Sequence, residues 1–183
     1  DGENLLFDGG LLVGISGKVS DNVRSSPNPN DADFVSMNRV TKVMPVVSEF
    51  DVKGIFSDAG AGASSLPVQV FHKAYAWNKP RHRRYVIVEY SIKNTGTSAL
   101  NSLYAGIYTD WDINMGDASG FNNNKAATDL ARGLGYTYNL EQGGFYAGVQ
   151  LLTNTNAGFN HYAMDHNSTG GSVNPNTSYN TAD

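Results

Sequence analysis

The sequence predicts an all-β fold, a mostly antiparallel two-sheet β-sandwich of the jelly-roll kind with at most one short helix. Apolar and polar residues alternate with a period of two along much of the 183-residue chain, and little helical periodicity competes with that alternation. Gly and Pro residues separate the alternating stretches at short intervals, which is typical of short strands joined by turns. A chain of this length can form its own core, so we expect a single domain over residues 1–183.

The clearest strands are predicted in the middle of the chain. In "LPVQVFHKAYAW", Val68 and Val70 share one face while Gln69 and Phe71 share the other. The turn "NKPRHRR" and the β-branched stretch "YVIVEYSIKN" complete a hairpin. Further strands are expected at residues 101–111, 133–139 and 145–153, weaker ones at 11–16, 34–44 and 49–56, one short helix at 124–133, and an irregular tail at 166–183.

Composition narrows the classes of function. The chain has no Cys, which removes disulfides, thiolate metal sites and Cys nucleophiles. A net charge of −4 argues against nucleic-acid binding, and no apolar run is long enough for membrane insertion. Few charged residues, with abundant Gly, Tyr, Asn, Ser and Thr, favour a secreted or cell-surface bacterial protein. The abrupt start without Met suggests a piece of a larger secreted chain.

Asp and Asn residues gather around "TDWDIN" and in the loop that follows it. The D-x-D-x-N spacing can direct several oxygen ligands at one calcium ion. An EF-hand would need Gly at the sixth loop position and Glu at the twelfth, but Gly116 is seventh and Phe121 is twelfth, so the loop is not an EF-hand. The candidate Ca²⁺ ligands are Asp110, Asp112, Asn114, Asp117, Asn122, Asn124 and Asp129.

Two other interpretations of this cluster stay open. Asp and Asn also end strands, because their side chains accept backbone N–H bonds and tolerate turn conformations. Alternatively, Asp110 and Asp112 would project from one strand face about 7 Å apart, which suits an acid pair in a glycoside-active enzyme. No zinc spacing surrounds His161 and His166, and the basic run "KPRHRR" is either a solvated hairpin tip or a site for a polyanion.

A repeated pattern singles out two tyrosines. "LYAGIY" and "FYAGVQ" place Tyr104 and Tyr146 in equivalent strand positions, which makes the two strands candidates for neighbours in one sheet. Gly106 and Gly148 then mark points where a neighbouring chain segment comes close. Exposed aromatic rings can stack on sugars, although the same residues also fill strand cores. The candidate ligand-binding residues are Trp111, Tyr104 and Tyr146.

The combination of "VEYSIKNTG", "LYAG" and "DWDI" resembles a region of large secreted bacterial proteins that use type IX secretion. The resemblance covers residues 5–165. In that family the region often lies downstream of a subtilisin-like serine protease domain. The resemblance implies an accessory β-sandwich with its catalytic domain elsewhere in the parent chain. The recurring family positions fall on Asp110, Trp111, Asp112, Asn122, Asn123, Asn124 and Asp129.

The sequence therefore predicts a non-catalytic accessory or binding module of a secreted bacterial multidomain protein, with a structural Ca²⁺ site at a sheet-end loop. Its expected partners are a glycan or a cell-surface protein, together with other domains of the parent chain. Two alternatives belong to other classes. One is a carbohydrate-active or protease-associated enzyme that uses Asp110 and Asp112, and the other is a self-assembling or adhesive surface unit with an open sheet edge.

Overall fold

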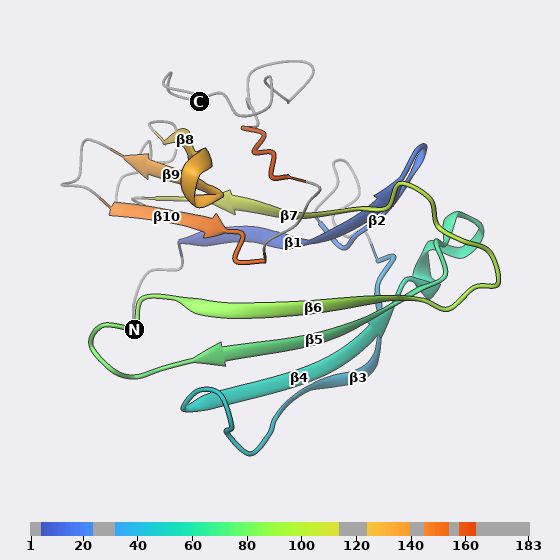
Figure 1. Ribbon diagram of the computed structural model, residues 1–183, viewed down its shortest axis with the longest axis horizontal. Coiled ribbons are helices and arrows are strands. Elements are labelled where there is room, and N and C mark those ends of the chain that lie inside the picture. The colour runs from blue at the N-terminus through green and yellow to red at the C-terminus, as the bar shows by residue number, and fades with distance from the viewer. Residues whose placement is uncertain (1–4, 24–31, 114–123, 140–144, 154–157, 164–183) are drawn as a thin grey trace. The chain divides into compact units, whose positions relative to one another are not determined.

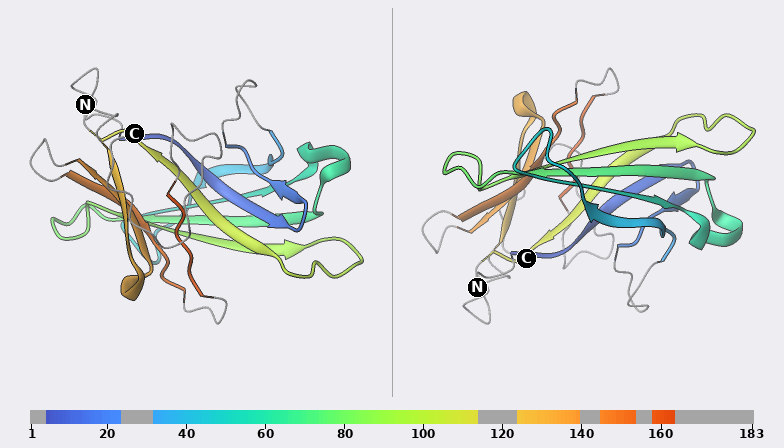
Figure 2. Two further views of the ribbon diagram at one scale, coloured as in Figure 1. Left: turned by 90° about the horizontal axis from the view of Figure 1, so that it is seen from above. Right: turned by 90° about the horizontal axis from the view of Figure 1, so that it is seen from below.

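The structure, a computed structural model, describes residues 5–23, 32–113, 124–139, 145–153 and 158–163. These residues form an all-β fold, as predicted (Figures 1 and 2). The strands are β1 (Leu6–Ile15), β2 (Lys18–Ser20), β3 (Val35–Lys42), β4 (Phe50–Ser57), β5 (Val68–Ala76), β6 (Val86–Asn94), β7 (Tyr104–Trp111), β8 (Lys125–Asp129), β9 (Leu134–Asn139) and β10 (Phe145–Gln150). The described helices are two short 3-10 turns, η1 (Ala59–Ser64) and η3 (Leu130–Arg132), and none within these ranges is long and apolar enough to cross a membrane.

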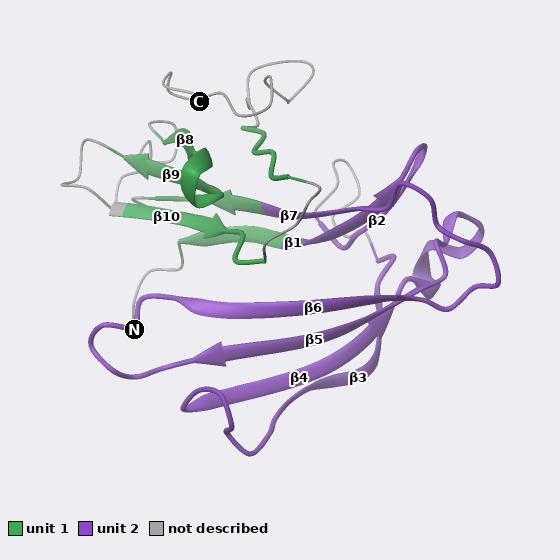
Figure 3. Ribbon diagram, viewed as in Figure 1, with its two compact units in different colours: residues 1–9, 109–183 green, residues 10–108 purple. Residues whose placement is uncertain are grey.

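The strands form three sheets, with orders β2-β1-β7, β3-β4-β5-β6 and β10-β9-β8. The chain divides into two compact units (Figure 3). The central unit contains residues 10–108, and the terminal unit contains residues 1–9 and 109–183. Both boundaries fall inside strands, in β1 and in β7. The single domain and the two-sheet sandwich stay predictions.

The core of the central unit lies between β1 and the four-stranded sheet. That sheet is an antiparallel meander whose strand order is the order along the chain. Alternation in β5 buries Val68 and Val70 and leaves Phe71 exposed, which confirms the predicted faces. Leu11 and Val13 of β1 pack in the same cluster as these two valines. Burial of apolar side chains on both elements stabilises the unit.

A buried carboxylate fixes the segment between β4 and β5. Asp58 is 2% exposed and precedes η1. Its carboxylate accepts hydrogen bonds from the hydroxyl of Ser20 at 3.2 Å, from the backbone N–H of Val68 at 3.0 Å, and from the backbone N–H of Leu66. Asp58 therefore ties β2, η1 and the start of β5 together.

The sheet of the terminal unit corrects the predicted helix at residues 124–133. Lys125–Asp129 form strand β8, which pairs antiparallel with β9, and only Leu130–Arg132 turn as a 3-10 helix. Gly133 ends that turn in the left-handed conformation, with φ 60°. A helix of at most ten residues is marginal by itself, so pairing with β9 decides the conformation of this segment.

Candidate functional site

Three tyrosines share one face of the β10-β9-β8 sheet. Tyr136 and Tyr138 are two residues apart on β9, so they point to the same side. Tyr146 on β10 is directly opposite Tyr138 in the strand register. The ring centroids of Tyr138 and Tyr146 are 5.7 Å apart with nearly parallel planes, and those of Tyr136 and Tyr146 are 6.1 Å apart. We call Tyr136, Tyr138 and Tyr146 the tyrosine platform.

A glycine leaves space beside the platform. Gly148 is the register partner of Tyr136, and it adds no side chain to this face. A Cβ atom at position 148 would lie 2.7 Å from the Cβ of Tyr136. The close approach therefore requires Gly and keeps the space next to the Tyr136 ring open. The close approach of a neighbouring strand at Gly148 was predicted from the sequence.

A charged pair borders the same face. Asp129 ends β8, and its carboxylate accepts a hydrogen bond from the backbone N–H of Arg132 at 3.2 Å. The same carboxylate forms an ion pair with the Arg132 guanidinium at 3.0 Å. The Arg132 side chain is 73% exposed, so it remains accessible for further hydrogen bonds.

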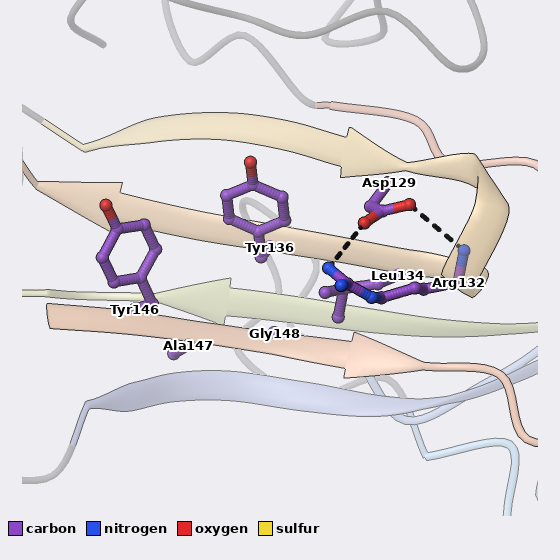
Figure 4. Close-up of a pocket in the computed structure, with 7 residues that line it drawn as sticks. All are labelled: Asp129, Arg132, Leu134, Tyr136, Tyr146, Ala147 and Gly148. Carbon is purple, nitrogen blue, oxygen red and sulfur yellow. Dashed lines mark hydrogen bonds and ion pairs between the residues drawn. The ribbon is translucent and has the colours of Figure 1, made fainter.

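Tyr136 and Tyr146 of the platform line an open pocket of about 330 Å³ together with the charged pair (Figure 4). The rings of Tyr136 and Tyr146 stand on the same side of the sheet as the Asp129–Arg132 pair. Pockets that bind small molecules combine mostly apolar or aromatic walls with a few directed polar groups. The residues that line this pocket are Asp129, Arg132, Leu134, Tyr136, Tyr146, Ala147 and Gly148.

His161 packs against β9 at Gly135. The His161 ring occupies the space that a Cβ atom at position 135 would need. Gly135 and Tyr136 are neighbours on a strand, so they point to opposite faces. Burial lowers the pKa of His161 below its ordinary value, because the buried site disfavours the charged imidazolium. His161 therefore supports the sheet behind the platform as a mainly neutral side chain at pH 7.

The predicted ligand-binding residues belong to two different sheets. Tyr146 belongs to the platform, whereas Tyr104 is 72% exposed on β7, which is in a different sheet. The predicted pairing of their strands is therefore wrong, and a Cβ atom at Gly106 would meet nothing within 4 Å. The sequence repeat reflects a shared local strand pattern, and strand pairing depends on distant partners. Trp111, at the end of β7, is half-buried.

Of the described residues in the predicted Asp and Asn cluster, Asp110, Asp112 and Asn124 lie around the end of β7, whereas Asp129 ends β8. Asp110 is in β7 and Asp112 lies after its last residue, so regular strand geometry does not extend across the pair. The Asn124 side chain donates a hydrogen bond to the Trp111 carbonyl at 3.0 Å, and its own Oδ1 is buried with no hydrogen-bond partner among the described residues. Asn114, Asp117 and Asn122 lie outside the described residues. Among the residues described, no group of three or more His, Asp or Glu could hold a metal.

Sequence reasoning missed Tyr136, Tyr138 and Arg132 as members of a site. The "YTY" alternation was a usable signal, because it places both rings on one strand face. The chain gives no match to protein-family models, to curated proteins or to solved structures. The candidate site therefore stands on its own geometry, as an aromatic face with one charged pair on an all-β scaffold.

Proposed function

We propose that the protein is a non-catalytic, glycan-binding module, and that the tyrosine platform is its binding site. The observation that carries this proposal is the set of three tyrosine rings, with centroids 5.7 to 6.1 Å apart, beside an open pocket that the Asp129–Arg132 pair borders. The candidate ligand class is a neutral or acidic sugar with a ring that can lie on one tyrosine face.

The chemistry of a pyranose fits these groups. One face of a sugar ring carries C–H bonds that pack on an aromatic ring, while hydroxyl groups at its edge need donors and acceptors. Arg132 supplies donors and Asp129 supplies acceptors at the border of the platform. The platform lies on paired strands, so few degrees of freedom are lost on binding.

The setting that we propose is that of an accessory module in a secreted bacterial protein. It is supported by the resemblance around "VEYSIKNTG" and "DWDI" and by the composition, with few charged residues, Gly 20 and Tyr 10. In such a setting the module holds its parent chain on a glycan or on a cell-surface glycoprotein, while a different domain carries any catalysis.

Glycan-array screening followed by calorimetric titration of the best ligand tests the proposal. Tyr146→Ala and Tyr136→Ala should each weaken binding by up to roughly tenfold, since aromatic contacts contribute about 0.5 to 1.5 kcal/mol. Tyr162→Ala is the matched control, because Tyr162 is 52% exposed and lies outside the pocket lining. Equal binding by all three variants, or no binding to any glycan, would overturn the proposal.

We also propose a structural calcium ion at the end of β7. The buried Asn124 Oδ1 favours it, because this oxygen has no hydrogen-bond donor among the described residues, and a cation can satisfy such a buried oxygen. Asp110 and Asp112 flank Trp111, whose carbonyl accepts the hydrogen bond from Asn124. Asp129 fits less well, since its carboxylate already binds Arg132.

Thermal unfolding in EDTA and across a calcium titration tests the ion separately from the glycan. An ion that binds only the folded chain stabilises it by about 2.7 kcal/mol at a hundredfold excess over its dissociation constant. Calcium should therefore raise the melting temperature, and Asp112→Ala should abolish the rise. An unchanged melting temperature at millimolar calcium would refute the metal site and leave the tyrosine platform unaffected.

A further inference from the structure

Two loops of the central unit meet at the same end of the β3-β4-β5-β6 sheet (Figure 1). One is residues 43–49, between β3 and β4, and the other is residues 77–85, between β5 and β6. Phe50 and Ala76 are register partners, which places the two loops side by side. The Ser48 hydroxyl accepts a hydrogen bond from the Ala76 N–H at 3.1 Å, and the Glu49 carboxylate accepts one from the Asn78 N–H at 2.7 Å. We call this pair of loops the sheet tip.

The first loop presents aliphatic side chains to solvent from a fixed backbone. The Asp51 carboxylate accepts hydrogen bonds from the backbone N–H groups of Val46, Val47 and Ser48 at 2.8 to 2.9 Å. Met44, Val46 and Val47 are 84%, 87% and 60% exposed. A single exposed apolar residue is ordinary on a protein surface, but here three lie on one loop. Because hydrogen bonds to Asp51 already order this loop, burial of the three side chains against a partner would cost little further conformational entropy.

The second loop adds positive charge and aromatic rings. Trp77 and Tyr85 are its first and last residues, and their ring centroids are 5.6 Å apart. Backbone hydrogen bonds from the N–H groups of His82 and Arg83 to the Lys79 carbonyl, at 2.8 and 2.9 Å, close the turn. Glu49 lies 3.9 Å from Lys79 and is the one acidic residue of these two loops. The bases of this loop are all exposed: Lys79, Arg81, Arg83 and Arg84.

We propose that the sheet tip docks on an anionic lipid bilayer surface. The aliphatic side chains of Met44, Val46 and Val47 would enter the boundary between headgroups and acyl chains, and the arginines would contact lipid phosphates. Trp and Tyr are enriched at that depth of a membrane. This contact is peripheral, since it uses two loop tips and no spanning segment.

The apolar residues decide between a bilayer and a soluble polyanion. An acidic polysaccharide or a nucleic acid would satisfy the arginines but would give Met44, Val46 and Val47 no apolar phase in which to be buried. A bilayer offers both an anionic surface and an apolar layer within reach of the same loops. The overall charge of −4 does not oppose the contact, because attraction to a charged surface acts within a Debye length, about 10 Å at 0.1 M salt.

Co-sedimentation of the full chain with vesicles tests the inference. Binding to phosphatidylglycerol-rich vesicles is expected, with at least tenfold weaker binding to pure phosphatidylcholine. Val46→Asp should reduce the partition coefficient about tenfold, since one buried Val contributes about that factor. Arg83→Gln with Arg84→Gln should reduce it about 25-fold, at roughly fivefold per charge.

Matched controls lie at the other end of the central unit, where a Lys18 amino group contacts the Ala63 carbonyl at 3.5 Å. Val19 is 52% exposed there, so Val19→Asp makes the same substitution at another exposed Val and should leave binding unchanged. Lys93→Gln is the corresponding charge control. Each variant is first checked for an unchanged melting temperature.

Three outcomes would overturn the inference. The first is no binding to anionic vesicles at low salt. The second is binding that Val46→Asp leaves intact while Arg83→Gln with Arg84→Gln abolishes it and soluble heparin competes, which would assign the tip to a soluble polyanion. The third is concentration-dependent self-association that Val46→Asp removes without any vesicle binding, which would assign it to a second copy of the chain.

Discussion

Replacement of Asp58 by Ala should destabilise the central unit strongly. The variant leaves the backbone N–H groups of Leu66 and Val68 without their acceptor, and both residues are 1% exposed. The hydroxyl of Ser20, which is 0% exposed, loses its partner as well. A buried donor without a partner costs about 1 to 3 kcal/mol, so the two amides alone predict a loss of about 2 to 6 kcal/mol. That loss is comparable with the whole stability of a small domain, about 5 to 15 kcal/mol.

Urea unfolding measures this loss. Trp77 lies in the central unit and Trp111 in the terminal unit, so a Trp111→Phe background lets fluorescence report on the central unit alone. With a urea slope of about 2 kcal/mol per molar, the midpoint should fall by about 1 to 3 M. Glu89→Ala is the control. Glu89 binds Lys73 and Tyr75 on the surface, where such pairs contribute little, so the midpoint should barely move.

A fall of less than about 1 kcal/mol in Asp58→Ala would refute the argument from buried donors. It would mean that water or a rearranged loop satisfies the amides at small cost. A changed urea slope would point instead to a loss of two-state unfolding or to a more compact denatured state.

Three further predictions concern pH and the platform. Hydrogen bonds from Ser48 and from neighbouring backbone amides hold the pKa of Asp51 far below 3.8, so the stability that they add is present above pH 3.8 and is lost as the pH falls below it. Acid titration of the wild type should show this loss of stability, and Asp51→Asn should show less of it. Burial lowers the pKa of His72 below 6.5, so as the pH falls the unfolded chain protonates this imidazole before the folded chain does. Stability should therefore fall as the pH drops below 6.5, and His72→Phe should flatten that part of the profile of stability against pH. Gly148→Ala should lower both the melting temperature and the glycan affinity, because the new methyl group would lie 2.7 Å from the Cβ of Tyr136; Gly106→Ala, with nothing within 4 Å, should change neither. Equal effects of the two Gly variants would contradict the assignment of the close approach.

The alternation of apolar and polar residues along the sequence predicted the strands of the central unit well. Val68 and Val70 are buried in β5 as expected, and the hairpin of β5 with β6 follows the predicted turn. The short strand β2 was not predicted, because three residues carry too little periodicity. The predicted helix at residues 124–133 failed for a different reason. Its residues suit a helix locally, but hydrogen bonds to β9 stabilise them as a strand.

The site was predicted only in part. Tyr146 was identified from the repeat that it shares with Tyr104, and Asp129 was predicted as a Ca²⁺ ligand, although its carboxylate binds Arg132 in the structure. The register of β9 against β10 places Tyr136, Tyr138 and Tyr146 next to one another. Register is set by turn geometry and by contacts between distant residues, which one sequence does not display. The glycan, calcium and lipid contacts stay proposals that the experiments above decide.

The sequential order of β3, β4, β5 and β6 has a consequence for the pathway of folding. Each of these strands pairs with its neighbour along the chain, so the sheet can grow by successive hairpins that close short loops. The core also requires a long-range contact, because Leu11 and Val13 pack against Val68 and Val70, which are more than fifty residues away along the chain. We therefore expect the meander to form early and β1 to dock late. Pulse-labelled hydrogen exchange should show amide protection in β4 and β5 before protection in β1, and the reverse order would contradict this pathway.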